Sequence, residues 1–182
     1  YSFSHFPHHD ILLKLSTEPN HPWNAEMLHR NLIDKSMPER DEFWSIYTAL
    51  NYFEEDEDQG ESIIKTIIDW AWYANIENTE DERVRLCSII LVWLFSTPNR
   101  KVRDYSSKAL VSILSKKSQF MEELLHKFKD INDSYILERL YCAVYGAILI
   151  VNDIQVISKI SNITYELFFK EKEPYPNMLT RD

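Results

Sequence analysis

Apolar side chains recur at intervals of three or four residues in one segment of this 182-residue chain after another. Side chains with this spacing lie on one face of an α-helix. Two adjacent rows in the segment 63–72 illustrate the pattern: Ile63, Ile67, Ala71 and Ile64, Ile68, Trp72. Between 84 and 95, ten of twelve residues are apolar, which predicts a helix enclosed by its neighbours. The chain has only two glycines, and this scarcity disfavours β-rich and doubly wound folds.

The pattern predicts an all-α fold of about six to seven helices in one helical-repeat domain covering residues 1–182. We expect an irregular lead at 1–22 and an irregular tail at 170–182, and we expect the chain to be a fragment of a larger protein. Asn24 is a predicted helix cap, and Ser36 with Glu39 and Thr79 with Glu82 match the capping-box pattern.

Two segments share one pattern of apolar and small residues. Counted from Asn99, the offsets +3, +4, +7, +10 and +11 fall on Val102, Arg103, Ser106, Ala109 and Leu110. Counted from Asp133, they fall on Ile136, Leu137, Leu140, Ala143 and Val144. This repeat predicts an α-solenoid of HEAT-like or TPR-like helical hairpins, with the subfamily left open. The alternative is that any two amphipathic helices share such offsets.

The formal net charge of −9 disfavours nucleic acid as a general partner, because binding a phosphate backbone needs a basic surface. One stretch, 99–129, is locally basic, with eight Lys or Arg against three acids. It is a candidate surface for an acidic partner or nucleic acid, and the alternative is a solvated helix face. Its candidate binding residues are Arg100, Lys101, Arg103 and Lys108, with Lys116 and Lys117 added for nucleic acid. Neighbouring opposite charges, such as Arg103 and Asp104 or Glu138 and Arg139, predict ion pairs between repeats.

Tryptophans at 70, 72 and 93 suggest either a core or a platform that stacks on rings. Trp72 and Trp93 fall on predicted buried faces, so we expect both in the core. Trp70 falls outside the buried rows and is the better candidate for contacting a partner, with a contact between helices as the alternative.

Catalytic and metal-binding patterns have little support in this sequence. His5, His8, His9 and Asp10 form a cluster of possible zinc or nickel ligands, but it lacks partners to complete a site. The acidic connector 54–61 reads as a solvated loop. Neither a Walker loop nor a dinucleotide fingerprint is present. We therefore expect no catalytic residues, no cofactor and no metal, with a helical hydrolase using surface carboxylates as the alternative.

Cys87 and Cys142 lie in apolar helical patterns and are expected to be reduced core thiols, which favours a cytoplasmic location. The longest uninterrupted apolar run, 89–95, is too short to span a bilayer, so we expect no membrane partner.

Five strings, taken in their order and spacing, resemble the C-terminal helical-repeat region of bacterial antiviral STAND NTPases of the Avs type. They are NAEMLH at 24–29, MPERDEFW at 37–44, DWAW at 69–72, LVWLFSTPNRKVRD at 91–104 and NDSYILERL at 132–140. In that family an effector domain comes first, an ATP-binding module next and a helical-repeat sensor last. The resemblance implies a sensor segment that recognises a viral protein, such as a phage terminase or portal, or packs against adjacent repeats. It transfers no catalytic residue to this chain.

Overall fold

The computed structural model describes residues 9–51 and 62–170. Side chains are described for residues 9–45 and 62–170. This part of the chain is all-α and contains no strand, which confirms the predicted fold class. Its nine α-helices are α1 (His9–Ser16), α2 (Ala25–Leu32), α3 (Met37–Asn51), α4 (Ile63–Tyr73), α5 (Asp81–Trp93), α6 (Arg100–Lys116), α7 (Gln119–Phe128), α8 (Ser134–Val151) and α9 (Ile154–Phe168). Short 3₁₀ turns η2 (Ile76–Asn78) and η3 (Leu94–Ser96) border α5.

The helix count exceeds the six or seven expected, in part because α1 lies inside the predicted irregular lead at 1–22. Leu12 and Leu13 are buried in this short helix. Most of the predicted tail at 170–182 lies outside the described residues.

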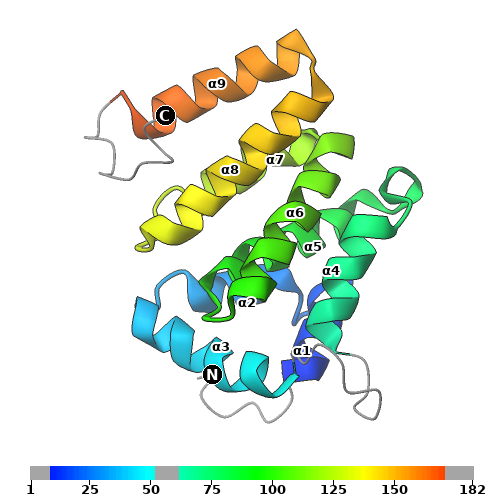
Figure 1. Ribbon diagram of the computed structural model, residues 1–182, viewed down its shortest axis with the longest axis vertical. Helices are drawn as coiled ribbons and strands as arrows, with labels where there is room; N and C mark the ends of the chain where they lie inside the picture. Colours follow the sequence, from blue (N-terminus) through cyan, green and yellow to red (C-terminus); the bar gives the residue numbers. More distant parts are fainter. Residues whose placement is uncertain (1–8, 52–61, 171–182) are drawn as a thin grey trace.

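Helix α5 forms the centre of the core, as the dense apolar run predicts. Every residue from 86 to 97 is buried, including Trp93 at 0% exposure. Helices α4, α6 and α8 lie in one row, with α6 packed against both of the others, and α9 packs on α7 and α8 (Figure 1). Helices α1, α2 and α3 occupy the opposite end of the molecule from α9 (Figure 1).

The repeated offsets of the sequence correspond to equivalent positions in α6 and α8. Asn99 and Asp133 are the N-caps, and each side chain accepts hydrogen bonds from the backbone N–H groups two and three residues further on. All positions at the shared offsets are buried except Arg103, which is half-buried. The two helices are parallel, because Arg139 contacts Asp104 while Gly146 lies against Val111, further along both helices.

The other predicted caps are formed in part. Asn24 caps α2 by accepting a 3.0 Å hydrogen bond from the N–H of Glu26. The Glu39 carboxylate accepts a 2.8 Å hydrogen bond from the N–H of Ser36, which is one half of a capping box. The box predicted at Thr79 is wrong, because α5 begins at Asp81 and the Thr79 hydroxyl donates to the carbonyl of Asn75 instead.

Within the described residues, α8 alone is long and apolar enough to cross a membrane by length and composition. Core helices of water-soluble domains meet the same criterion, and α8 packs against α6 and α9 with a third of its residues buried. A single helix of this kind is weak evidence for a membrane span.

The two cysteines differ in their surroundings. Both are free, but only Cys87 is buried, while Cys142 is exposed on α8. The expectation that Cys142 is a core thiol is wrong, because the buried face of α8 passes through Leu140, Ala143 and Val144 on either side of it.

Candidate interaction surface

Three aromatic rings and one lysine gather on the exposed side of α4 and α6. The Trp72 ring stacks on Tyr73, with centroids 5.9 Å apart and planes 16° from parallel, and lies 6.2 Å from the ring of Tyr105. The ammonium of Lys108 lies 5.9 Å from the Trp72 centroid and 5.8 Å from that of Tyr105. We call Trp72, Tyr73, Tyr105 and Lys108 the aromatic–lysine patch.

The patch is accessible, and its rings are held on regular helices. Tyr73 is 78% exposed and Tyr105 is 40% exposed, whereas Trp72 is half-buried. The carbonyl of Trp72 accepts a 3.3 Å hydrogen bond from Ser112, which ties the end of α4 to α6. Exposed aromatic side chains with few rotatable bonds are enriched among the residues that dominate protein interfaces.

The expectation that Trp72 lies in the core is wrong, whereas the role of Trp70 in binding a partner stays a prediction. The buried stripe of α4 consists of Ile64, Ile67, Ile68 and Ala71, so the two tryptophans lie on its two flanks. Trp70 is half-buried and packs against the core. Trp72 is not in the core, because its flank faces Tyr105 of α6. The sequence signal for this placement is that Trp72 stands last in its apolar row and is followed by Tyr73, which belongs to neither row.

The candidate basic residues of α6 fall into two groups. Arg100, Lys101 and Lys108 are exposed, and Lys108 belongs to the aromatic–lysine patch. Arg103 instead turns inward: it donates a 2.7 Å hydrogen bond to the carbonyl of Thr97 and lies 5.4 Å from the ring of Tyr135. The ion pair between α6 and α8 is made by Asp104 with Arg139, at 3.0 Å, rather than by Arg103.

The basic stretch 99–129 does not form one continuous basic face. Lys117 pairs with Asp81 at 2.7 Å, and Lys127 pairs with Glu26 at 3.0 Å. Both lysines therefore link helices of the chain to one another and are largely covered, with side-chain exposures of 16% and 17%. A surface that attracts a phosphate backbone would need these lysine charges to be exposed and not paired with carboxylates of the same chain.

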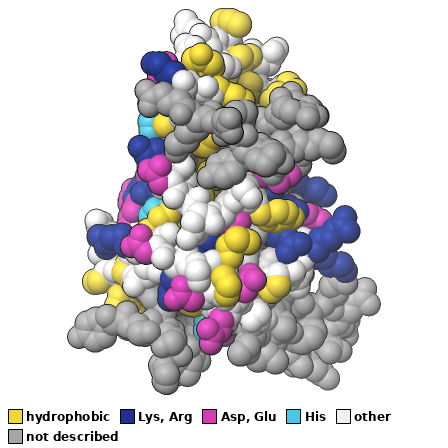
Figure 2. Space-filling model, turned by 90° about the vertical axis from the view of Figure 1, so that its left-hand side faces the viewer, with side chains coloured by type: hydrophobic (Ala, Val, Ile, Leu, Met, Phe, Trp, Pro, Cys, Tyr) yellow, Lys and Arg dark blue, Asp and Glu magenta, His cyan; other side chains and the backbone are white. Residues whose placement is uncertain are grey.

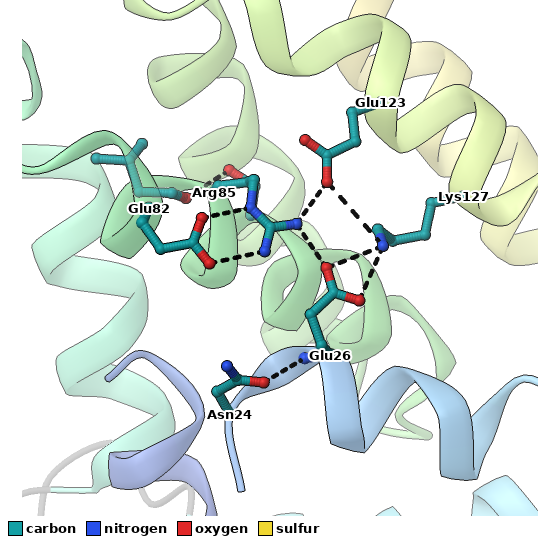
Figure 3. Close-up of polar contacts among 8 residues, drawn as sticks. Asn24, Glu26, Glu82, Arg85, Glu123 and Lys127 are labelled. Atoms are coloured by element: carbon teal, nitrogen blue, oxygen red, sulfur yellow. Dashed lines mark hydrogen bonds and ion pairs between the residues drawn. The ribbon is translucent and has the colours of Figure 1, made fainter. Parts of the chain in front are cut away.

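An ion-pair network joins α2, α5 and α7 (Figure 3). At its centre, Arg85 makes two 2.8 Å hydrogen bonds with Glu82 and one of 2.5 Å with each of Glu26 and Glu123. Lys127 reaches both oxygens of Glu26 at 3.0 Å. The hydrogen bonds to Glu82 and the other carboxylates raise the pKa of Arg85. Burial by itself would raise the pKa of Glu26, but the hydrogen bonds from Arg85 and Lys127 outweigh burial and lower this pKa.

The acids considered for hydrolysis are engaged separately. Asp69 pairs with Lys65 at 2.6 Å on α4, Glu82 with Arg85 on α5, and Asp104 with Arg139 between α6 and α8. A pair of carboxylates with unequal pKa values in one cleft is what acid–base hydrolysis needs. These three acids lie on three different helices, each beside a cation.

The predicted histidine cluster is only partly within the described residues. His5, His8 and the acidic connector 54–61 lie outside them. His9 packs against Phe43, with ring centroids 4.9 Å apart, and burial lowers its pKa. Among residues 9–51 and 62–170 no group of three or more His, Cys, Asp or Glu is arranged to hold a metal ion.

His29 and Cys87 are titratable groups buried in the core. His29 is 8% exposed, with its ring 5.5 Å from Trp93 and 4.9 Å from Phe128. Burial, assisted by the nearby Lys127, lowers its pKa to about 4. Burial raises the pKa of Cys87 to about 12, so its thiol is inert at neutral pH.

Comparison with known proteins finds no matching family model, no matching curated protein and no matching solved structure.

Proposed function

We propose that this chain is a non-catalytic α-solenoid segment that binds a protein partner through the aromatic–lysine patch. The observation that carries the proposal is the exposure of Tyr73 and Tyr105 beside the Lys108 ammonium, on helices fixed by their packing. Such a surface provides large apolar contacts and one cation that pairs with a carboxylate of the partner. The parallel, in-register helices α6 and α8 support the repeat arrangement.

Within the parent protein, the segment belongs to the sensor of an antiviral STAND NTPase and recognises a phage protein. The resemblance of the five strings between residues 24 and 140 supports this role, and the all-helical fold agrees with it. In this proposal the patch is the part of the sensor that touches the viral protein. ATP hydrolysis would then reside elsewhere in the parent protein.

The test measures binding of the purified chain to a panel of purified phage terminases and portals. A Tyr73→Ala/Tyr105→Ala variant and a Lys108→Glu variant should each lose at least about tenfold in affinity for the terminase or portal that binds. Tyr165→Ala is the matched control, because Tyr165 is 57% exposed on α9 and lies outside the patch. If every terminase and portal fails to bind, or if the patch variants bind as well as the control, the proposal is wrong.

A stand-alone scaffold that binds an acidic partner or nucleic acid through 99–129 has less support, because Lys117 and Lys127 are already paired. Binding to a single-stranded oligonucleotide that weakens steeply with added salt, and that needs Arg100 and Lys101, would favour this alternative instead. The helical hydrolase has less support still, because Asp69, Glu82 and Asp104 are dispersed among ion pairs.

A further inference from the structure

The end of the helix row at α8 and α9 exposes large apolar side chains. On α8, Tyr145 is 64% and Leu149 is 63% exposed; on α9, Ile154 is 77% and Tyr165 is 57% exposed. We call these four residues the end face. Figure 2 shows hydrophobic side chains at this upper end of the molecule, where α9 lies. Helix α9 buries only Ile160 fully, although it is 15 residues long.

The register between α6 and α8 indicates which secondary-structure element can pack on the end face. Asp104, Ser107 and Val111 are among the α6 residues that meet α8: the first two bond to Arg139, and Val111 lies against Gly146. The N-caps Asn99 and Asp133 are 34 positions apart in the sequence. The residue of α8 equivalent to Val111 of α6 is therefore Tyr145. Tyr145 therefore occupies on α8 the position that on α6 is covered by the next parallel helix, whereas Tyr141, the counterpart of Ser107, packs against Phe168 of α9.

The same register explains why the face is apolar. Residues spaced three and four apart on one side of a helix meet a common neighbour, and Leu149 follows Tyr145 at this spacing. Ile154 and Tyr165 are exposed apolar residues of α9, which packs against α8. Clustered exposed apolar groups, such as Tyr145 and Leu149 one helical turn apart, mark an interaction site more often than scattered single residues do.

We infer that the end face receives a further helical hairpin whose first helix runs parallel to α8, in the register in which α8 packs on α6. This inference rests on the proposed repeat arrangement. In the contact between α6 and α8, a Cβ at Gly146 would lie 3.3 Å from the Val111 side chain, so a small residue is needed there. By the same register, the incoming helix carries a small residue opposite Tyr145. A second copy of the chain related by a two-fold axis would place Tyr145 against the same face of the other α8, whereas this register pairs one face of α6 with a different face of α8.

The test extends the full chain by one hairpin, repeating residues 129–170 between Lys170 and Glu171, so that the copy keeps its connector and the N-cap Asp133 and the added Gly146 can face the original Tyr145. Hydrogen exchange of the original α9 amides should slow by at least about tenfold relative to the unextended chain. Tyr145→Lys with Leu149→Lys in the original hairpin should abolish this protection, and so should Gly146→Leu in the added hairpin alone. Tyr73→Lys, on the aromatic–lysine patch, should leave the protection intact.

Because Tyr145 and Leu149 are exposed, the lysine variant of the unextended chain should keep its helical circular dichroism and its thermal midpoint. The inference is overturned if the added hairpin gives no protection, or if protection survives the lysine substitutions. It is also overturned if sedimentation shows that the unextended chain dimerises and that Tyr145→Lys dissolves the dimer. None of these readouts involves a phage protein, so their failure is distinguishable from failure of the proposed partner binding.

Discussion

Arg40, at the start of α3, donates a 2.5 Å hydrogen bond from Nη2 to Oδ1 of Asn132, immediately before the cap of α8. The arginine side chain is fully buried, its Nη1 donates to the carbonyl of Leu32 at 3.3 Å, and Asp133 lies 3.7 Å away with 7% exposure. Burial lowers the pKa of Arg40, and the charge of Asp133 partly offsets this effect. These contacts of Arg40 link α2 and α3 to the start of α8.

Arg40→Met should destabilise the protein by about 3 kcal/mol, because Asp133 is then a buried carboxylate without its cation. Arg40→Met/Asp133→Asn should recover part of the loss, since the asparagine keeps a capping oxygen without the charge. Urea unfolding at pH 7 measures both. A double variant no more stable than the single one would show that the charge of Asp133 is not the cause.

Arg85→Ala should cost about 2 kcal/mol, because Glu26 and Glu123 lose a partly buried partner that joins α2 to α7. The loss should depend weakly on salt, since the Arg85 side chain is only 18% exposed. Arg100→Ala is the control: this side chain is 85% exposed and 3.5 Å from Asp104, so its removal should leave the denaturation midpoint unchanged. Equal effects of the two substitutions would contradict a structural role for the network.

His29 should make the protein less stable as the pH falls from about 6.5 toward 4. Its pKa is about 4 in the fold and 6.5 in the unfolded chain, so the unfolded state takes up the proton first. The stability from neutral His29 is complete above pH 6.5, and about 2 kcal/mol of it should be lost at pH 5.

The measurement for His29 compares urea unfolding of the wild type and His29→Phe at pH 7.5 and 5. The difference between the two proteins isolates His29 from His9, whose lowered pKa acts in the same direction. Glu26 and Glu82 lose their contribution only at lower pH, because their pKa values lie below 4.5. Parallel pH profiles would show that His29 does not titrate as a buried group.

Cys142 should react with iodoacetamide at pH 8 in the native protein, whereas Cys87 should react only after unfolding. Cys87 is fully buried with a pKa raised to about 12, while Cys142 is exposed and its pKa is raised less, by partial burial and Glu138. Mass spectrometry of tryptic peptides, with and without urea, separates the two sites. Alkylation of Cys87 at a similar rate in the native state would indicate that α5 opens locally.

Much of the fold could be predicted because helical spacing depends on local sequence. The enclosed helix around Trp93 and the matching offsets after Asn99 and Asp133 are both present in the structure. Helix boundaries were less predictable: α1 is short, and Thr79 bonds back to Asn75 rather than capping α5. Such choices depend on tertiary contacts that a single sequence does not display.

The candidate surface could be predicted only in part. Lys108 and the exposed basic residues of α6 follow from the helix pattern, but the inward turn of Arg103 follows from the position of Thr97 and Tyr135. Trp72 and Tyr105 are 33 positions apart, and nothing local indicates that their rings meet. The link between Arg40 and Asn132, across 92 positions, is equally hidden.

The unbroken burial of α5 and its following turn, from 86 to 97, has a consequence for how such a protein can change during evolution. No side chain in that stretch is free to vary without disturbing packing on several sides. New recognition properties must therefore arise by mutation on the outer helices, at positions such as Tyr73, Tyr105 and Lys108. A randomised library confined to those three positions should consist mostly of folded proteins, each with a different surface on an unchanged scaffold.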